Sequence, residues 1–68
     1  MKQISGEDFC KLLEECEWEL KRVSGSHHVY AKSGHRERIV IPIHGNKPLK
    51  LGLLKVQMKI AGIREDQL

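Results

Sequence analysis

The sequence of 68 residues is poor in aromatic rings, cysteine and long apolar runs. Its aromatic residues are Phe9, Trp18 and Tyr30, too few for a surface that stacks many nucleic-acid bases. Cys10 and Cys16 lie on nearly opposite faces of a segment that we predict to be helical, which argues against a disulfide. Because there is no apolar run of membrane-spanning length and no signal-peptide pattern, we expect a soluble, cytoplasmic protein without a membrane partner.

The charge is unevenly distributed along what we expect to be a single domain over residues 1–68. The net charge is +3, but residues 1–20 carry −4 and residues 21–60 carry +8, with Glu37 as their one acid. An acidic first quarter and a basic body indicate a face for a polyanion such as RNA. A solvated basic surface without a ligand is the alternative.

Apolar spacing predicts one helix followed by three strands. Ser5 is expected to cap the helix, with Asp8 three residues later and Phe9 opening an apolar stripe. Alternation with a period of two predicts strands, joined by short Gly- and Ser-containing turns, over 18–23, 27–32 and 38–43. We expect Trp18 and Leu20 to face the core, and Pro42 to mark an edge strand or a strand end.

A second helix is expected to begin between Lys50 and Gly52 and to end at Gly62, followed by a frayed polar tail. Its expected apolar face consists of Leu53, Leu54, Val56, Met58, Ile60 and Ala61. The predicted fold class is therefore α+β, with the order α-β-β-β-α, a three-stranded antiparallel sheet and both helices on one face. This order is that of double-stranded-RNA-binding domains.

The stretch 22–30 carries the candidate site, because it places a Gly-Ser turn and two histidines between two predicted strands. Successive side chains of a strand point to opposite faces, so at most one of His27 and His28 points to the core. The other lies beside the backbone N–H groups of Gly25 and Ser26. An imidazole exchanges protons near neutral pH, and N–H groups with a cation such as Arg22 can hold a phosphate. A hairpin that merely contains histidines is the alternative.

Four separated segments resemble the HicA-type toxins of bacterial toxin–antitoxin systems. They are Gly-Ser-His-His-Val-Tyr at 25–30, Val-Ile-Pro-Ile-His-Gly-Asn at 40–46, Leu-Lys-Leu-Gly-Leu-Leu at 49–54 and Ala-Gly-Ile at 61–63. The resemblance implies a small ribonuclease that cleaves mRNA, needs no metal or other cofactor, and has a double-stranded-RNA-binding-like fold. It also implies a HicB-type antitoxin as partner, with a free monomer that becomes a hetero-oligomer. The catalytic histidine of the family falls on His27.

One position departs from the family pattern. Members usually have glycine directly before the aromatic residue that starts the first strand, whereas Glu17 precedes Trp18 here. If this position needs a positive φ, glutamate costs about 1 kcal/mol there.

Further residues are candidates for contacts with the substrate. Basic side chains at Lys47, Lys50, Lys55 and Lys59 are expected to contact RNA phosphates. His28 is expected to be structural or to lie at the rim of the site, and His44 is a second candidate proton carrier or a solvated loop residue.

Two other functions remain open from the sequence. A non-catalytic RNA-binding module would use the same basic face and bind RNA without cutting it. A metal site is disfavoured because His27, His28, His35 and His44 lack the spacing of zinc ligands.

Overall fold

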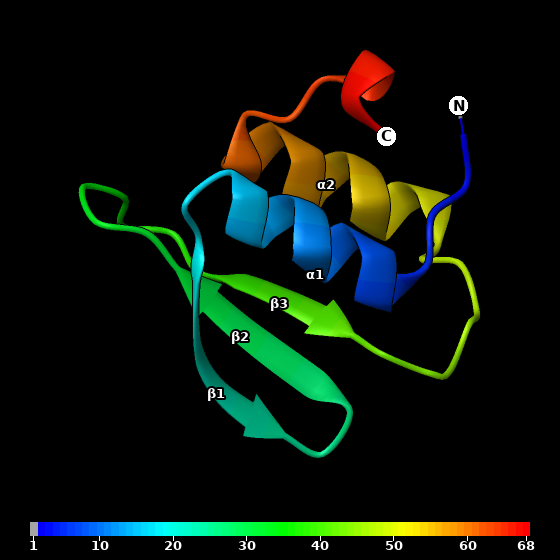
Figure 1. Cartoon of the computed structure of the whole chain (residues 1–68), viewed down its shortest axis with the longest axis horizontal. Coiled ribbons are helices and arrows are strands. Elements are labelled where there is room, and N and C mark those ends of the chain that lie inside the picture. Colours follow the sequence, from blue (N-terminus) through cyan, green and yellow to red (C-terminus); the bar gives the residue numbers. More distant parts are fainter. Residues whose placement is uncertain (1) are drawn as a thin grey trace.

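The chain folds into two helices on one face of a three-stranded antiparallel sheet (Figure 1). The computed structural model describes residues 2–68. Its elements are α1 (Gly6–Glu15), β1 (Glu19–Ser24), β2 (His27–Ala31), β3 (Ile39–Pro42), α2 (Leu51–Ala61) and a short 3-10 helix, η1 (Glu65–Gln67). The strands lie in the order β1-β2-β3. The predicted α+β fold with the order α-β-β-β-α is confirmed.

Burial shows which face of the sheet the helices cover. Tyr30 pairs with Ile39 across β2 and β3, and Ile41 pairs with His28, so these four side chains share one face. Tyr30, Ile39 and Ile41 are almost fully buried, and they form one core with apolar residues of both helices. The helical members of that core are Phe9, Cys10, Leu13, Leu54 and Met58. The opposite face of the sheet, which we call the open face, is therefore left without a helix.

The start of α1 is fixed by a cap and by a close approach to β3. The Asp8 N–H donates to Ser5 Oγ at 3.1 Å, which confirms the predicted cap. Gly6 lies so close to the end of β3 that a Cβ there would stand 2.6 Å from the carbonyl oxygen of Pro42. Only glycine fits this contact without a shift of the backbone, so the helix and the strand end are held together.

Strand β1 departs from the prediction because it carries a β-bulge. Leu20 pairs with Tyr30 and Arg22 pairs with Val29, so Lys21 is the extra residue. Every residue of β1 is exposed, and Leu20 keeps 44% of its surface in water. Trp18 is buried as predicted, but the prediction that Leu20 shares its core is wrong. The strand lies at one edge of the sheet (Figure 1).

The second helix begins and ends where predicted, but its apolar face is narrower. Val56 is 55% exposed, so its assignment to the core face is wrong, whereas Leu54 and Met58 are buried. Gly62 ends the helix with a φ of +72°, and the Ile63 N–H donates to the Met58 carbonyl at 3.0 Å. Within residues 2–68, no helix is long and apolar enough to cross a membrane.

The tail after Gly62 is ordered rather than frayed. Residues 65–67 form η1, and Leu68 packs against the core. The Lys2 ammonium donates to the Leu68 carbonyl at 3.3 Å, so the two ends of the described chain lie close together (Figure 1).

Glu17 has a φ of +72°, so the position does require the left-handed conformation that glycine adopts without strain. We expect Glu17→Gly to raise the free energy of unfolding by about 1 kcal/mol. Glu17→Ala removes the same charge but keeps the Cβ, and it should give no comparable gain. Chemical denaturation of the three proteins measures this, and equal stability of the two variants would contradict the backbone explanation.

Leu54 is 1% exposed in the shared core, whereas Val56 on the same helix is 55% exposed. We expect Leu54→Ala to lower the free energy of unfolding by about 2–5 kcal/mol. The control Val56→Ala should change it by less than about 0.5 kcal/mol. The denaturation midpoints of the two variants test this, and an unchanged midpoint for Leu54→Ala would remove Leu54 from the core.

Candidate functional site

A tight turn joins β1 to β2 and presents free backbone donors. Ser24 pairs with His27, so Gly25 and Ser26 are the two turn residues. Gly25 has a φ of +60° and Ser26 does not have a positive φ, which is the pattern of a type II′ turn. In the described part of the chain, neither the Gly25 nor the Ser26 N–H donates a hydrogen bond. These two groups are therefore available to an anion beside His27.

The two histidines lie on opposite faces of β2, as predicted. His28 shares the helix-covered face with Tyr30 and Ile41 and is half-buried. His27 pairs with Pro42 on the open face and is exposed. No described residue forms a hydrogen bond or an ion pair with its imidazole, so both ring nitrogens can exchange protons with a ligand.

The loop after β3 is held next to this turn. The Ile43 N–H donates to the Ser26 carbonyl at 2.8 Å, and the Leu49 N–H donates to the Ile4 carbonyl at 2.8 Å. Between these two anchors the loop lines a hollow of about 530 Å³. The residues that line it are Pro42, His44, Lys47, Pro48, Leu49 and Lys50. Because Pro42 is the strand partner of His27, the hollow lies at the same end of the sheet as His27.

Five of the predicted substrate-binding residues lie at or near the same end of the sheet as His27. Arg22, Gly25 and Ser26 lie on β1 or in the turn, and Lys47 and Lys50 lie in the adjoining loop. The structure thus places these five at or near the end of the sheet that carries His27.

Three predicted residues do not share the open face with His27. Lys55 and Lys59 are exposed on α2, which covers the other face of the sheet. His28 also points to the covered side. Any role for these three side chains therefore requires a surface different from the open face.

Two basic residues beside Arg22 were not among the predicted site residues. Lys21 and Arg38 line a hollow of about 310 Å³ with Arg22 and Val29. Val29 shares the open face with His27, so both arginines lie on that face too. The alternation of Arg38 with Val40 and Pro42 in the sequence could have placed Arg38 on the open face. Its proximity to Arg22 could not be predicted, because that depends on the register of the strands.

On the covered side of the sheet, the buried side chains of Tyr30 and Cys10 have raised pKa values. The Tyr30 hydroxyl donates to Glu14 Oε2 at 3.1 Å. Burial raises the pKa of the Tyr30 hydroxyl far above its usual value, and hydrogen bonding with Cys10 adds to this. Burial likewise raises the pKa of the Cys10 thiol, so neither group supplies an anion near neutral pH. We assign Tyr30 and Cys10 to the core.

The chemistry that the site can perform is proton transfer next to a bound anion. An exposed imidazole lies beside two free N–H groups and several cations, a combination that suits a phosphodiester. Within residues 2–68, no group of three or more His, Cys, Asp or Glu side chains could hold a metal ion.

Comparison with known proteins adds two findings. A family model described as HicA toxin of bacterial toxin–antitoxin matches residues 6–63. A solved structure described as "HicA3 and HicB3 toxin-antitoxin complex" is similar to this chain, with 36% sequence identity and a TM-score of 0.64. The match covers 87% of this chain and 94% of the other. A search of curated proteins found no match.

Proposed function

Because the chain belongs to the HicA family of toxins from bacterial toxin–antitoxin systems, we propose that it is a metal-independent ribonuclease that cuts mRNA. The catalytic residue in this proposal is His27. The observation that carries it is the placement of an exposed, unpartnered imidazole beside the free N–H groups of Gly25 and Ser26. A histidine that served only the core would point to the covered face, as His28 does.

The mechanism follows from the chemistry of RNA. Each phosphodiester has a neighbouring 2′-hydroxyl, which attacks the phosphorus when a base removes its proton. As the 2′-oxygen bonds to phosphorus, the bond from phosphorus to the 5′-oxygen breaks. The His27 imidazole takes the 2′-proton while water protonates the leaving 5′-oxygen, or its protonated form donates to that oxygen while water takes the 2′-proton. Such catalysis typically contributes about 10²–10⁴-fold. Negative charge accumulates on the phosphate oxygens in the transition state. The N–H groups of Gly25 and Ser26, with the cations of Arg22, Lys47 and Lys50, stabilise this charge without a metal ion.

The proposed partner is a HicB-type antitoxin. The similar solved structure is described as a complex of HicA3 with HicB3. We propose that this chain is a monomer when free and forms a hetero-oligomer with its antitoxin, in the cytoplasm where mRNA is present. An antitoxin that covers the turn at Gly25 and Ser26 would exclude the substrate from His27.

His27→Ala should lower the rate of RNA cleavage by about 10²–10⁴-fold, because the substitution removes the proton carrier. The fold should be retained, since the side chain is exposed. His28→Ala is the matched control: the adjacent residue points to the core face, so its loss should act mainly on stability. Cleavage of a labelled mRNA, with and without EDTA, and circular dichroism are measured on each protein.

Three results would contradict this assignment. A folded His27→Ala protein that cuts at the wild-type rate would remove His27 from catalysis. Cleavage by the wild-type protein that requires added metal would favour a metal enzyme. RNA that is bound but never cut by the wild-type protein would favour a non-catalytic RNA-binding module.

Expression of the wild-type chain alone should stop bacterial growth, and co-expression of its HicB-type antitoxin should restore growth. The His27→Ala chain should be tolerated without antitoxin, because toxicity in this proposal comes from cleavage. Growth curves after induction test both statements. Normal growth at high levels of soluble wild-type protein would contradict the proposed toxic activity.

A further inference from the structure

We propose that single-stranded RNA binds along the open face of the sheet and that Arg22 and Arg38 clamp its backbone. This inference rests on the proposed ribonuclease function and names the path of its substrate. The path runs from His27 at one end of β2 to the β2–β3 loop, residues 32–38, at the other end.

The strand register places Arg22 close to the imidazole of His27. Arg22 is the cross-strand partner of Val29, which lies two residues after His27 on the same face. At about 3.3 Å per residue, this separation along the strand is about 7 Å. Arg38 lines the same hollow as Arg22 and Val29, so the two guanidinium groups approach one site from β1 and from the segment before β3.

The charges on this face are not neutralised by the protein. No described residue forms an ion pair or hydrogen bond with the guanidinium group of Arg22 or Arg38. The carboxylate of Glu19 is already paired with Lys21 at 3.0 Å. Two unpaired guanidinium groups beside one hollow suit an oligoanion, because a guanidinium binds phosphate oxygens with two parallel hydrogen bonds.

The basic surface continues toward the β2–β3 loop. A second hollow of about 340 Å³ shares Lys21 and Arg38 with the first. It adds the cations Lys32 and Arg36 and one acid, Glu19, whose carboxylate is paired with Lys21. Glu37, the one acid of the loop, lines neither hollow. The His35 ring lies 5.2 Å from the buried Trp18 ring, which holds the loop against the core.

The character of the face favours single-stranded RNA and predicts how it is recognised. The rings of Phe9, Trp18 and Tyr30 are all buried, so the open face offers none of them as a platform on which bases could stack. The contacts must then be mostly to phosphates, which carry little sequence information. A three-stranded sheet is only about 10 Å across at the usual strand spacing, which suits one strand better than a duplex.

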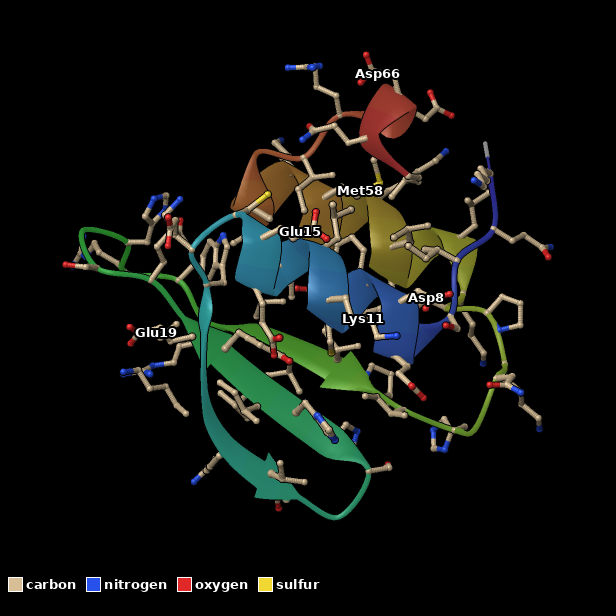
Figure 2. All side chains as sticks on the ribbon, in the orientation of Figure 1. Asp8, Lys11, Glu15, Glu19, Met58 and Asp66 are labelled. Atoms are coloured by element: carbon tan, nitrogen blue, oxygen red, sulfur yellow. The ribbon has the colours of Figure 1, made fainter. Side chains whose placement is uncertain are left out.

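The inference is tested by RNA affinity in a His27→Ala background, where the RNA is not cut. Arg22→Gln and Arg38→Gln should each weaken binding of a short fluorescent single-stranded RNA about tenfold, the loss expected for a charge-assisted contact. Each should also lower the slope of log affinity against log salt by about 0.7. Lys11→Gln is the matched control: it removes one charge from the exposed face of α1 (Figure 2) and should change neither quantity. Arg22→Lys should recover part of the affinity.

The outcomes separate this inference from the proposed function. If the wild-type protein cuts RNA but both arginine variants bind it as tightly as the His27→Ala parent, the clamp is wrong and the ribonuclease stands. If Lys11→Gln weakens binding as much as Arg22→Gln, binding is spread over the surface and the path is wrong. Arginine variants that keep RNA affinity but lose the antitoxin would make this face a protein interface and also overturn the path. If wild-type protein does not cut RNA, the proposed function fails on its own test.

Discussion

Burial of Tyr30 is the constraint on which the rest of the sheet depends. Its side chain is 1% exposed, and it lies opposite Ile39 on the face that the helices cover. Because side chains alternate along a strand, this burial places His28 on the same face and His27 on the other. A shift of one residue in the pairing of β2 would exchange the two histidines and expose the tyrosine. The position of the proposed catalytic residue is thus a consequence of core packing.

The same core explains why so much of the sheet is left uncovered. The buried apolar residues of α1 and α2 form one core with Tyr30, Ile39 and Ile41 of β2 and β3. No residue of β1 belongs to this core, and its helix-side residues Leu20 and Val23 stay exposed. An exposed edge strand risks pairing with other chains, and the bulge at Lys21 opposes such pairing through local twist and charge. The small core thus leaves β1 exposed, and this strand and its turn carry Arg22, Gly25 and Ser26 of the proposed site.

Local patterns in the sequence were enough to predict the elements and the two faces of β2. The cap at Ser5, the Gly25-Ser26 turn and the end of α2 at Gly62 each depend on a few neighbouring residues. The resemblance to a known family also indicated a strained position at Glu17, where the structure has a positive φ.

The features that could not be predicted from the sequence depend on contacts between residues far apart in the chain. Leu20 and Val56 fit the apolar periods, but burial depends on the tertiary packing around them, and they stay 44% and 55% exposed. The hollow shared by Arg22 and Arg38 depends on a bulge and on pairing between segments far apart in the chain. Lys55 and Lys59 had the charge expected of RNA contacts, but only the packing of α2 shows that they lie away from the open face.

Because His27 is exposed, the protein itself does not fix the orientation of its imidazole ring. An imidazole inside a cleft is oriented by the groups around it, whereas this one has no hydrogen-bond partner among the described residues. Its Cα is held by the strand pairing and the turn, but its ring is free to change rotamer. The ordering that catalysis requires must then come with the substrate, when phosphates bind at fixed points on either side of the ring. In the proposed path, Gly25 and Ser26 supply one such point and the arginine pair supplies the other. In the proposed function, one protein partner could abolish activity by covering this single exposed face.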